Sequence, residues 1–117
     1  MKKGICIGTL PGAISEEGFA LAVEAGFVGV ELGTLNDDET RRKAAALAKK
    51  HGVEIPSIMN SAHWAKPLSD PDPAVRQESV DGMMASFASA EAADAGTVLL
   101  VPAVVNAGTS YGTAWRN

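Results

Sequence analysis

Residues 97–105, TVLLVPAVV, form the most continuously apolar stretch of this chain. A short run this rich in Val and Leu is typical of a buried strand. Such a strand is expected to have a neighbour on each side and cover on both faces of its sheet. The residues that follow, NAGTSYGTAWRN, read as a loop entering a fourth helix. Because that segment is too short to cover the strand, we expect the sequence to be a fragment.

Three more apolar runs precede this one, and helical patterns separate them. The predicted strands are GICIGTL at 4–10, FVGVEL at 27–32 and VEIPSIM at 53–59. Helices are expected at about 16–26, 38–51 and 73–94. Their predicted caps are Ser15, then Asn36 or Asp37, then Asp72 before Pro73, and their predicted stops are Gly26, Gly52 and Gly96. The segment SDPDP at 69–73 is therefore interpreted as the start of a helix.

The spacing of apolar residues predicts which side of each helix is buried. The predicted inner residues are Phe19, Leu21, Ala22, Ala25 and Phe27, then Ala44, Leu47 and Ala48, then Val80, Met83, Met84 and Phe87. The two methionines are interpreted as core filling. The only cysteine, Cys6, lies in the first apolar run and is expected to be a small buried residue.

The resulting order is βαβαβαβ in one α/β domain over residues 1–117. Short apolar strands separated by amphipathic helices predict a parallel sheet. Right-handed crossovers then give either an open doubly wound sheet or part of a (β/α) barrel. Neither G-x-G-x-x-G nor G-x-x-x-x-G-K-[ST] is present, so the nucleotide-binding form of an open sheet loses its usual support.

Composition limits the class of function. A net charge of −4 and 5% aromatic residues are unlike a nucleic-acid binder, which needs a basic face. No apolar run approaches the roughly 20 residues that span a bilayer. The two lysines before GICIGTLPGAI resemble a weak signal peptide, but Gly and Pro interrupt that stretch and a strand explains it better. With a single cysteine, these features predict a cytoplasmic protein without disulfides.

Candidate site residues follow from the rule that parallel α/β folds bind ligands at the carboxyl ends of their strands. The predicted strand ends carry Thr9, Leu10 and Pro11, then Glu31, then Asn60, Ser61, His63 and Trp64, then Pro102, Ala103 and Asn106. Glu31 closes an apolar run, where it either accepts hydrogen bonds from substrate hydroxyls, pairs with a basic group or simply meets solvent. His63 is a candidate proton shuttle, metal ligand or donor to a substrate oxygen, or a loop histidine without a role. Trp64 offers an apolar wall with a polar tip, which suits a sugar-like ligand.

Two other charged residues receive simpler interpretations. Lys66 is a candidate phosphate contact, but an exposed loop lysine is the commoner case. His51 is expected to interact with the dipole at a helix C-terminus. Neither histidine has nearby partners for a metal site, and no catalytic or metal-ligating residue is assigned.

The segments GVEL, IPSIMNSAHW…PLSDPDPAVRQESVDGM and AADAGTVLLVP resemble the N-terminal half of sugar phosphate isomerases/epimerases of the xylose-isomerase-like TIM-barrel superfamily. The resemblance covers essentially the whole chain, and its most specific part runs from the third strand into the long helix. It implies that the chain is the first half of a (β/α)8 barrel, which is incomplete because such a barrel needs about 250 residues.

The resemblance also implies a divalent metal (Mn²⁺, Mg²⁺ or Co²⁺) and proton transfer beside a ketose carbonyl through an enediolate. The family's metal ligands and catalytic glutamates belong to later strands, so only substrate contacts carry over. The resemblance assigns these contacts to Glu31, Asn60, Ser61 and His63 and, less specifically, to Trp64 and Ala103. The isolated chain is expected to be inactive. Its expected partner is a small sugar or sugar phosphate, without nucleic acid or membrane. The alternatives are a non-catalytic half-barrel that self-associates or pairs with another chain and, more remotely, an endonuclease IV-like DNA-repair barrel.

Overall fold

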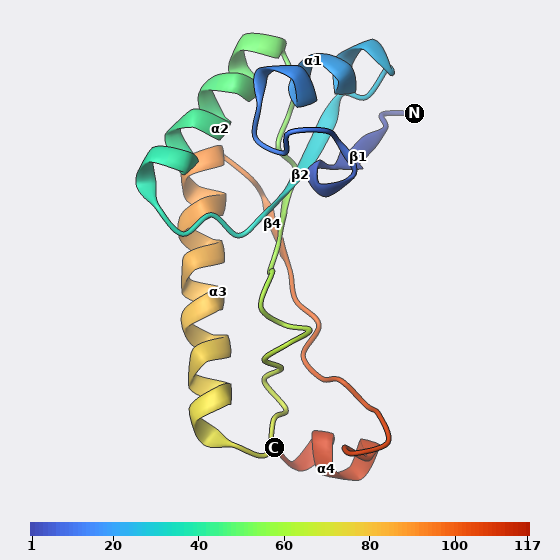
Figure 1. Ribbon diagram of the computed structural model, residues 1–117, viewed down its shortest axis with the longest axis vertical. Helices are drawn as coiled ribbons and strands as arrows, with labels where there is room; N and C mark the ends of the chain where they lie inside the picture. Colours follow the sequence, from blue (N-terminus) through green and yellow to red (C-terminus); the bar gives the residue numbers. More distant parts are fainter.

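The computed structural model describes all 117 residues, in which four parallel strands alternate with helices (Figure 1). The elements are β1 Gly4–Cys6, the 3-10 turn η1 Ile7–Thr9, α1 Glu16–Glu24, β2 Gly29–Gly33, α2 Asp38–His51, β3 Ser57–Met59, α3 Pro73–Ala93, β4 Thr97–Leu99 and α4 Tyr111–Arg116. The predicted βαβαβαβ order is confirmed, and the last segment does form a short fourth helix.

The sheet has the strand order β1-β2-β3-β4, and every neighbouring pair is parallel. Sequential order without reversal is the arrangement of a barrel, whereas a doubly wound sheet reverses its order at a switch point. The sheet remains open, since β1 and β4 each have one neighbour. The chain therefore builds four of the eight strands of a TIM barrel.

The helices start where the sequence predicts. The side chains of Ser15, Asp37 and Asp72 accept hydrogen bonds from backbone N–H groups in the first turns of α1, α2 and α3. Gly52 ends α2 in the left-handed conformation, with φ at 66°. The end of α3 differs from the prediction, because Asp94 rather than Gly96 takes the left-handed position, with φ at 54°.

Helices cover only one face of the sheet. Val30, Leu32 and Ile58 point to this face and are fully buried. Their neighbours on the other face, Glu31, Ser57 and Met59, are half-buried. Right-handed crossovers put α1, α2 and α3 on one side, so these 117 residues leave the opposite face open, as expected from the lack of a covering helix after the last apolar run.

The regular strands are shorter than their apolar runs. After Cys6 the chain turns into η1, and after Leu99 it continues without ladder pairing through Pro102, which lacks a backbone donor. Consequently Cys6 lies at a strand end and is half-buried, where full burial was predicted.

The inner side of α3 was predicted incorrectly. Val80, Met84 and Phe87 are 43%, 62% and 50% exposed, while the buried positions are the small residues Ser79, Ser86, Ser89 and Ala90. Small side chains let the helix approach the loops after β2 and β3 closely, and the hydroxyls of Ser86 and Ser89 donate to backbone carbonyls of the preceding turn. In α1 Phe19 and Ala22 are buried as expected, but Leu21 and Ala25 are exposed. The predicted face of α2 is confirmed through Ala44 and Ala48.

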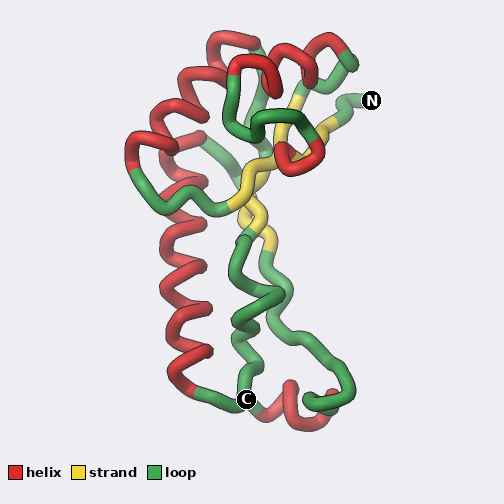
Figure 2. The backbone as a smooth tube through the Cα atoms, viewed as in Figure 1, coloured by secondary structure: helices red, strands yellow, loops and turns green.

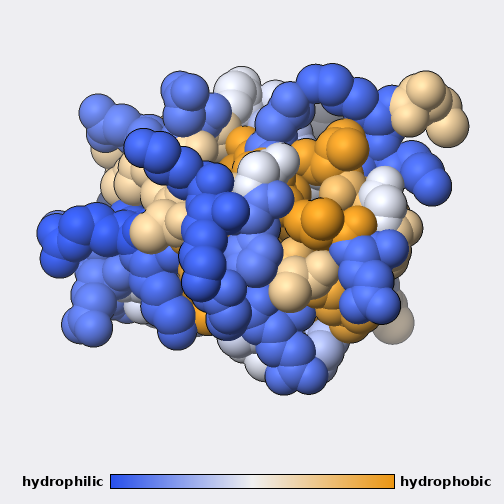
Figure 3. All heavy atoms as spheres, turned by 90° about the horizontal axis from the view of Figure 1, so that it is seen from above, coloured by the Kyte–Doolittle hydropathy of each residue, from blue (hydrophilic) through white to orange (hydrophobic).

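Two long segments without regular structure run together away from the sheet (Figure 2). The segment after β3 leads to the start of α3, and the segment after β4 leads to α4. They give the molecule its elongated dimensions of 45 × 28 × 23 Å. At the opposite end, near α1 and the N-terminus, apolar side chains reach the surface among charged ones (Figure 3). None of the helices has the length and apolar character that a membrane crossing requires.

Candidate functional site

A row of polar residues crosses the open face of the sheet at one level. Cys6 is the register partner of Glu31, and Ser57 is the register partner of Thr97. The two pairs are joined by a hydrogen bond, in which the Ser57 hydroxyl donates to Glu31 Oε1 at 2.8 Å. Because only one carboxylate oxygen has a protein partner, Glu31 Oε2 remains available to accept a hydrogen bond from a ligand hydroxyl.

The loops after β2 and β3 are held together by a reciprocal pair of hydrogen bonds. Thr34 N–H donates to Ser61 Oγ, and Ser61 N–H donates to Thr34 Oγ1, both at 3.1 Å. Thr34 Oγ1 also lies 2.8 Å from Ser86 Oγ on α3. On the same helix Ser89 Oγ bonds to both N and O of Leu35, at 3.0 Å each. Thus Ser61 belongs to a network that fixes the rim of the sheet against α3.

Asn60 points toward α3 and not toward the open face. It is fully buried, and its Oδ1 accepts from Ala62 N–H at 2.9 Å, while Nδ2 has no partner. The helix comes close at Gly82, where an added Cβ would lie 3.1 Å from Ala62 Cβ and 3.8 Å from Asn60 Oδ1. The geometry gives Asn60 a role in shaping the loop.

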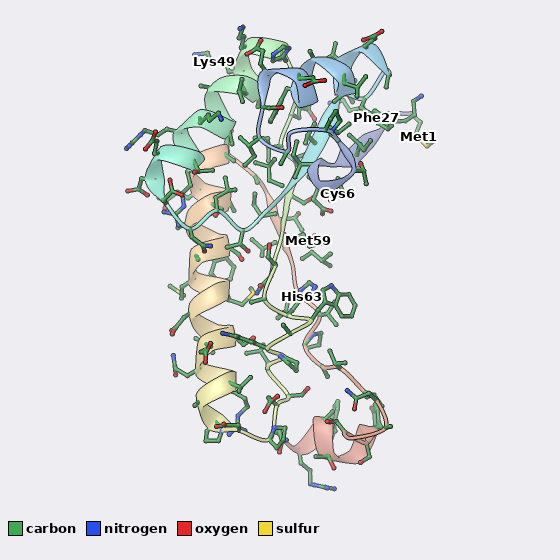
Figure 4. The ribbon with its side chains drawn as sticks, viewed as in Figure 1. Met1, Cys6, Phe27, Lys49, Met59 and His63 are labelled. Atoms are coloured by element: carbon green, nitrogen blue, oxygen red, sulfur yellow. The ribbon has the colours of Figure 1, made fainter.

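His63 is fully buried between the segments that follow β3 and β4 (Figure 4). Its Nδ1 accepts from Val101 N–H at 3.3 Å, so Nε2 carries the proton in the neutral ring, and Nε2 has no partner. Burial lowers the pKa of His63 below its ordinary value of 6.5. The imidazole is therefore a neutral hydrogen-bond donor near pH 7, and this favours the donor interpretation over a proton shuttle.

The Trp64 ring packs edge-on against His63, with centroids 5.0 Å apart and an interplanar angle of 81°. It is 64% exposed and lines a small cavity of 140 Å³ with Val104 and Asn106. Lys66 forms an ion pair with Glu78 of α3, so its charge is already neutralised locally.

Ala103 lies in a different cavity, of 480 Å³, between the segments after β3 and β4 and helix α4. None of the five cavities is lined by Glu31, Asn60, Ser61 or His63. A cavity of 510 Å³ lies near Val53 and Pro56 before β3, at the amino end of the strands, where parallel sheets do not place their ligands. The predicted residues are thus divided between the open sheet face, the rim network and the α4 cavity.

The residues present do not fit a metal ion. No three side chains of His, Cys, Asp or Glu come together in the way that would hold one. Glu31 has Cys6 and Ser57 as its neighbours on the open face, and Nδ1 of His63 is occupied by Val101.

Several residues of the site were missed at the sequence level. Ser57 alternates with Ile58 in β3, so the two-residue period of a strand was a signal that its side chain points to the open face. The serines of α3 recur at helical spacing and mark its buried side. The prediction instead assigned the side with the methionines to the core, because methionine is the more apolar residue. Tyr111 and Trp115, which line the α4 cavity, carried no pattern that placed them there.

Comparison with protein families gives one match. A family model described as "Xylose isomerase-like TIM barrel" matches residues 19–117, most of the chain. A comparison with curated proteins found no match.

Proposed function

Because this chain belongs to the xylose isomerase-like TIM-barrel family, we propose that it supplies half of the barrel of a sugar or sugar-phosphate isomerase/epimerase. The proposed reaction interconverts a ketose and an aldose, or epimerises a ketose, through an enediolate. Within that reaction the role of these residues is to hold and orient the substrate. The proposed partner is a small polyhydroxylated molecule.

The observation that carries the proposal is the position of Glu31. Its carboxylate lies half-buried on the open face, which is the interior in a closed barrel, and one of its oxygens accepts from Ser57. A carboxylate held in this way is a strong acceptor for sugar hydroxyls, since hydrogen bonds to ionised groups exceed neutral ones. In the proposal Trp64 adds an apolar wall, and the buried ring of His63 supports it through their edge-on contact.

The family often binds a divalent metal, which polarises a substrate carbonyl when it is bound. The 117 residues do not fit that group, so no step through a metal is assigned to them. The chain also lacks a close pair of carboxylates for acid–base chemistry on its open face, where Glu31 is the only acid in the polar row. We therefore expect this chain to bind sugars without catalysing their conversion. We also propose that the protein is cytoplasmic, a compartment consistent with its single free thiol.

Calorimetric titration with ketoses and aldoses tests the proposal. We expect saturable binding of at least one sugar, and a loss of about tenfold in affinity in Glu31→Gln, because a charge-assisted hydrogen bond is worth about 1.5–3 kcal/mol. Glu39→Gln, at an exposed position in the first turn of α2, is the matched control and should bind normally. Absence of binding across a broad panel would count against the proposal.

A DNA-repair function, known within the same superfamily, is disfavoured by charge. The net charge is −4, and four of the ten lysines and arginines (Lys2, Arg41, Lys50 and Lys66) form ion pairs with acidic residues. A DNA-binding face needs free cations aligned along the backbone. Tight, salt-dependent binding to a duplex with an abasic site would reverse this judgement.

A non-catalytic half-barrel that associates with a second copy is the other alternative, favoured by the two free sheet edges at β1 and β4. Light scattering distinguishes it, because a stable monomer that binds sugar removes the need for a second copy.

A further inference from the structure

The α4 cavity is the larger of the two cavities at the carboxyl side of the sheet. Its volume of 480 Å³ falls within the about 300–1,000 Å³ typical of small-molecule sites. Three segments meet around it: Leu68 and Ser69 from the loop after β3, Ala103 from the segment after β4, and Tyr111 and Trp115 from α4.

The aromatic pair gives the cavity a flat apolar wall. Tyr111 and Trp115 are nearly parallel, with an interplanar angle of 16° and centroids 6.3 Å apart, and they are 69% and 79% exposed. Aromatic faces of this kind pack well against the C–H face of a sugar ring.

One buried polar group in the wall lacks a partner. Ser69 is 3% exposed, and its hydroxyl makes no hydrogen bond although it can both donate and accept. Its backbone carbonyl is occupied, because Asn117 Nδ2 donates to it at 3.1 Å. A buried hydroxyl left without a partner costs free energy, which a ligand hydroxyl in this cavity would recover.

The cavity contains no charged side chain. Its remaining lining residues are apolar or neutral, and Arg116 is not among them, since its Nη1 lies beside Gly112 on α4. The nearby Lys66 is paired with Glu78. A phosphate group needs cationic or multiple N–H donors, so a phosphorylated end would lose its hydration here without compensation.

From these observations we propose that the α4 cavity binds the uncharged end of a non-phosphorylated sugar, with Trp115 stacking on the ring and Ser69 bonding a hydroxyl. The inference rests on the proposed sugar-binding function and selects the neutral sugar over the sugar phosphate as its ligand class.

Amide-resolved NMR titration with D-fructose and with D-fructose 6-phosphate tests this selection. We expect D-fructose to shift the indole N–H of Trp115 and the amide of Ser69, with at least about tenfold higher affinity than the phosphate. Ser69→Ala should weaken D-fructose binding roughly fivefold. Ser79→Ala is the matched control, because Ser79 is also buried without a partner but lines no cavity.

A second variant reverses the preference without removing any polar contact. Leu68→Lys adds a cation at the cavity wall and should raise affinity for D-fructose 6-phosphate by about tenfold. Equal or tighter binding of the phosphate by the unmodified chain would overturn the inference and leave the proposed function standing. Shifts from D-fructose near Glu31 but none at Trp115 would likewise overturn the inference about the α4 cavity and leave the proposed function standing. Failure of both probes to bind would overturn the inference, whereas the proposed function falls only if the broad panel of ketoses and aldoses also fails to bind.

Discussion

Ser57 and Glu31 come from neighbouring strands and meet on the uncovered face of the sheet, where the serine hydroxyl donates to Glu31 Oε1 at 2.8 Å. The two residues are 26 positions apart in the sequence, so only the parallel pairing of β2 and β3 brings them together. This contact fixes the direction of the one carboxylate in the polar row, and it links the fold to the proposed sugar binding.

Removal of the Ser57 hydroxyl should loosen Glu31 without unfolding the chain. In Ser57→Ala we expect sugar affinity to fall less than in Glu31→Gln, because the acceptor remains but is no longer oriented. Ser57→Thr keeps a hydroxyl and suits a strand, so it should restore most of the affinity. Calorimetric titration of the three variants measures the effect, and equal affinities in Ser57→Ala and the unmodified chain would show that the contact does not orient Glu31.

The close approach of α3 to the loop after β3 predicts intolerance of larger side chains at Gly82. Gly82→Val should destabilise the fold by about 1–3 kcal/mol, the usual cost of overpacking, although valine is a better helix former than glycine. Urea unfolding gives the change in free energy. Ala92→Val introduces the same side chain at an exposed position of α3 and should cost well under 1 kcal/mol. Equal costs in the two variants would contradict the packing described here.

The buried, neutral state of His63 predicts how stability depends on pH. Since burial holds the pKa of His63 below 6.5, the unfolded chain takes up a proton before the folded chain does. Stability is then full above about pH 6.5 and decreases as the pH falls below it. Urea midpoints measured from about pH 8 to about pH 5.5 should show this decrease, and His63→Asn should reduce it.

Two acidic groups act in a separate and lower pH window. Lys50 and His51, through hydrogen bonds and charge, lower the pKa of Glu16, and hydrogen bonds from Thr40 lower that of Asp37. A lowered carboxyl pKa gives stability that is present above the unfolded values of 4.5 and 3.8 and is lost as the pH falls through the folded values. A decrease that starts only near pH 4.5, with none around pH 6, would therefore assign the effect to these acids and contradict the burial of His63.

The order of elements was predictable because it depends on local signals. Ser15, Asp37 and Asp72 each cap a helix as predicted, and the strands coincide with apolar runs. Strand ends were not predictable, since apolar residues after Leu99 and Cys6 continue the pattern while the ladder stops.

The inner side of α3 and the composition of the site depended on tertiary packing. Small residues such as Ser86 and Ser89 face inward because the loop after β2 bonds to them, a contact between positions more than 50 residues apart. The rule that ligands bind at the carboxyl ends of parallel strands selected Glu31 and the loop that follows β3, and their role in binding stays a prediction. It did not separate residues such as Asn60, which points toward α3, from those on the open face, and it did not find Ser57.

The most direct test of the central claim is a titration with D-fructose followed by amide-resolved NMR. If the open face binds sugar, saturable shifts should appear at Glu31, Ser57 and the rim residue Thr34. They should be lost in Glu31→Gln and retained in Glu39→Gln. Shifts that do not saturate, or that persist unchanged in Glu31→Gln, would contradict the claim that this face is the substrate wall of a sugar isomerase/epimerase.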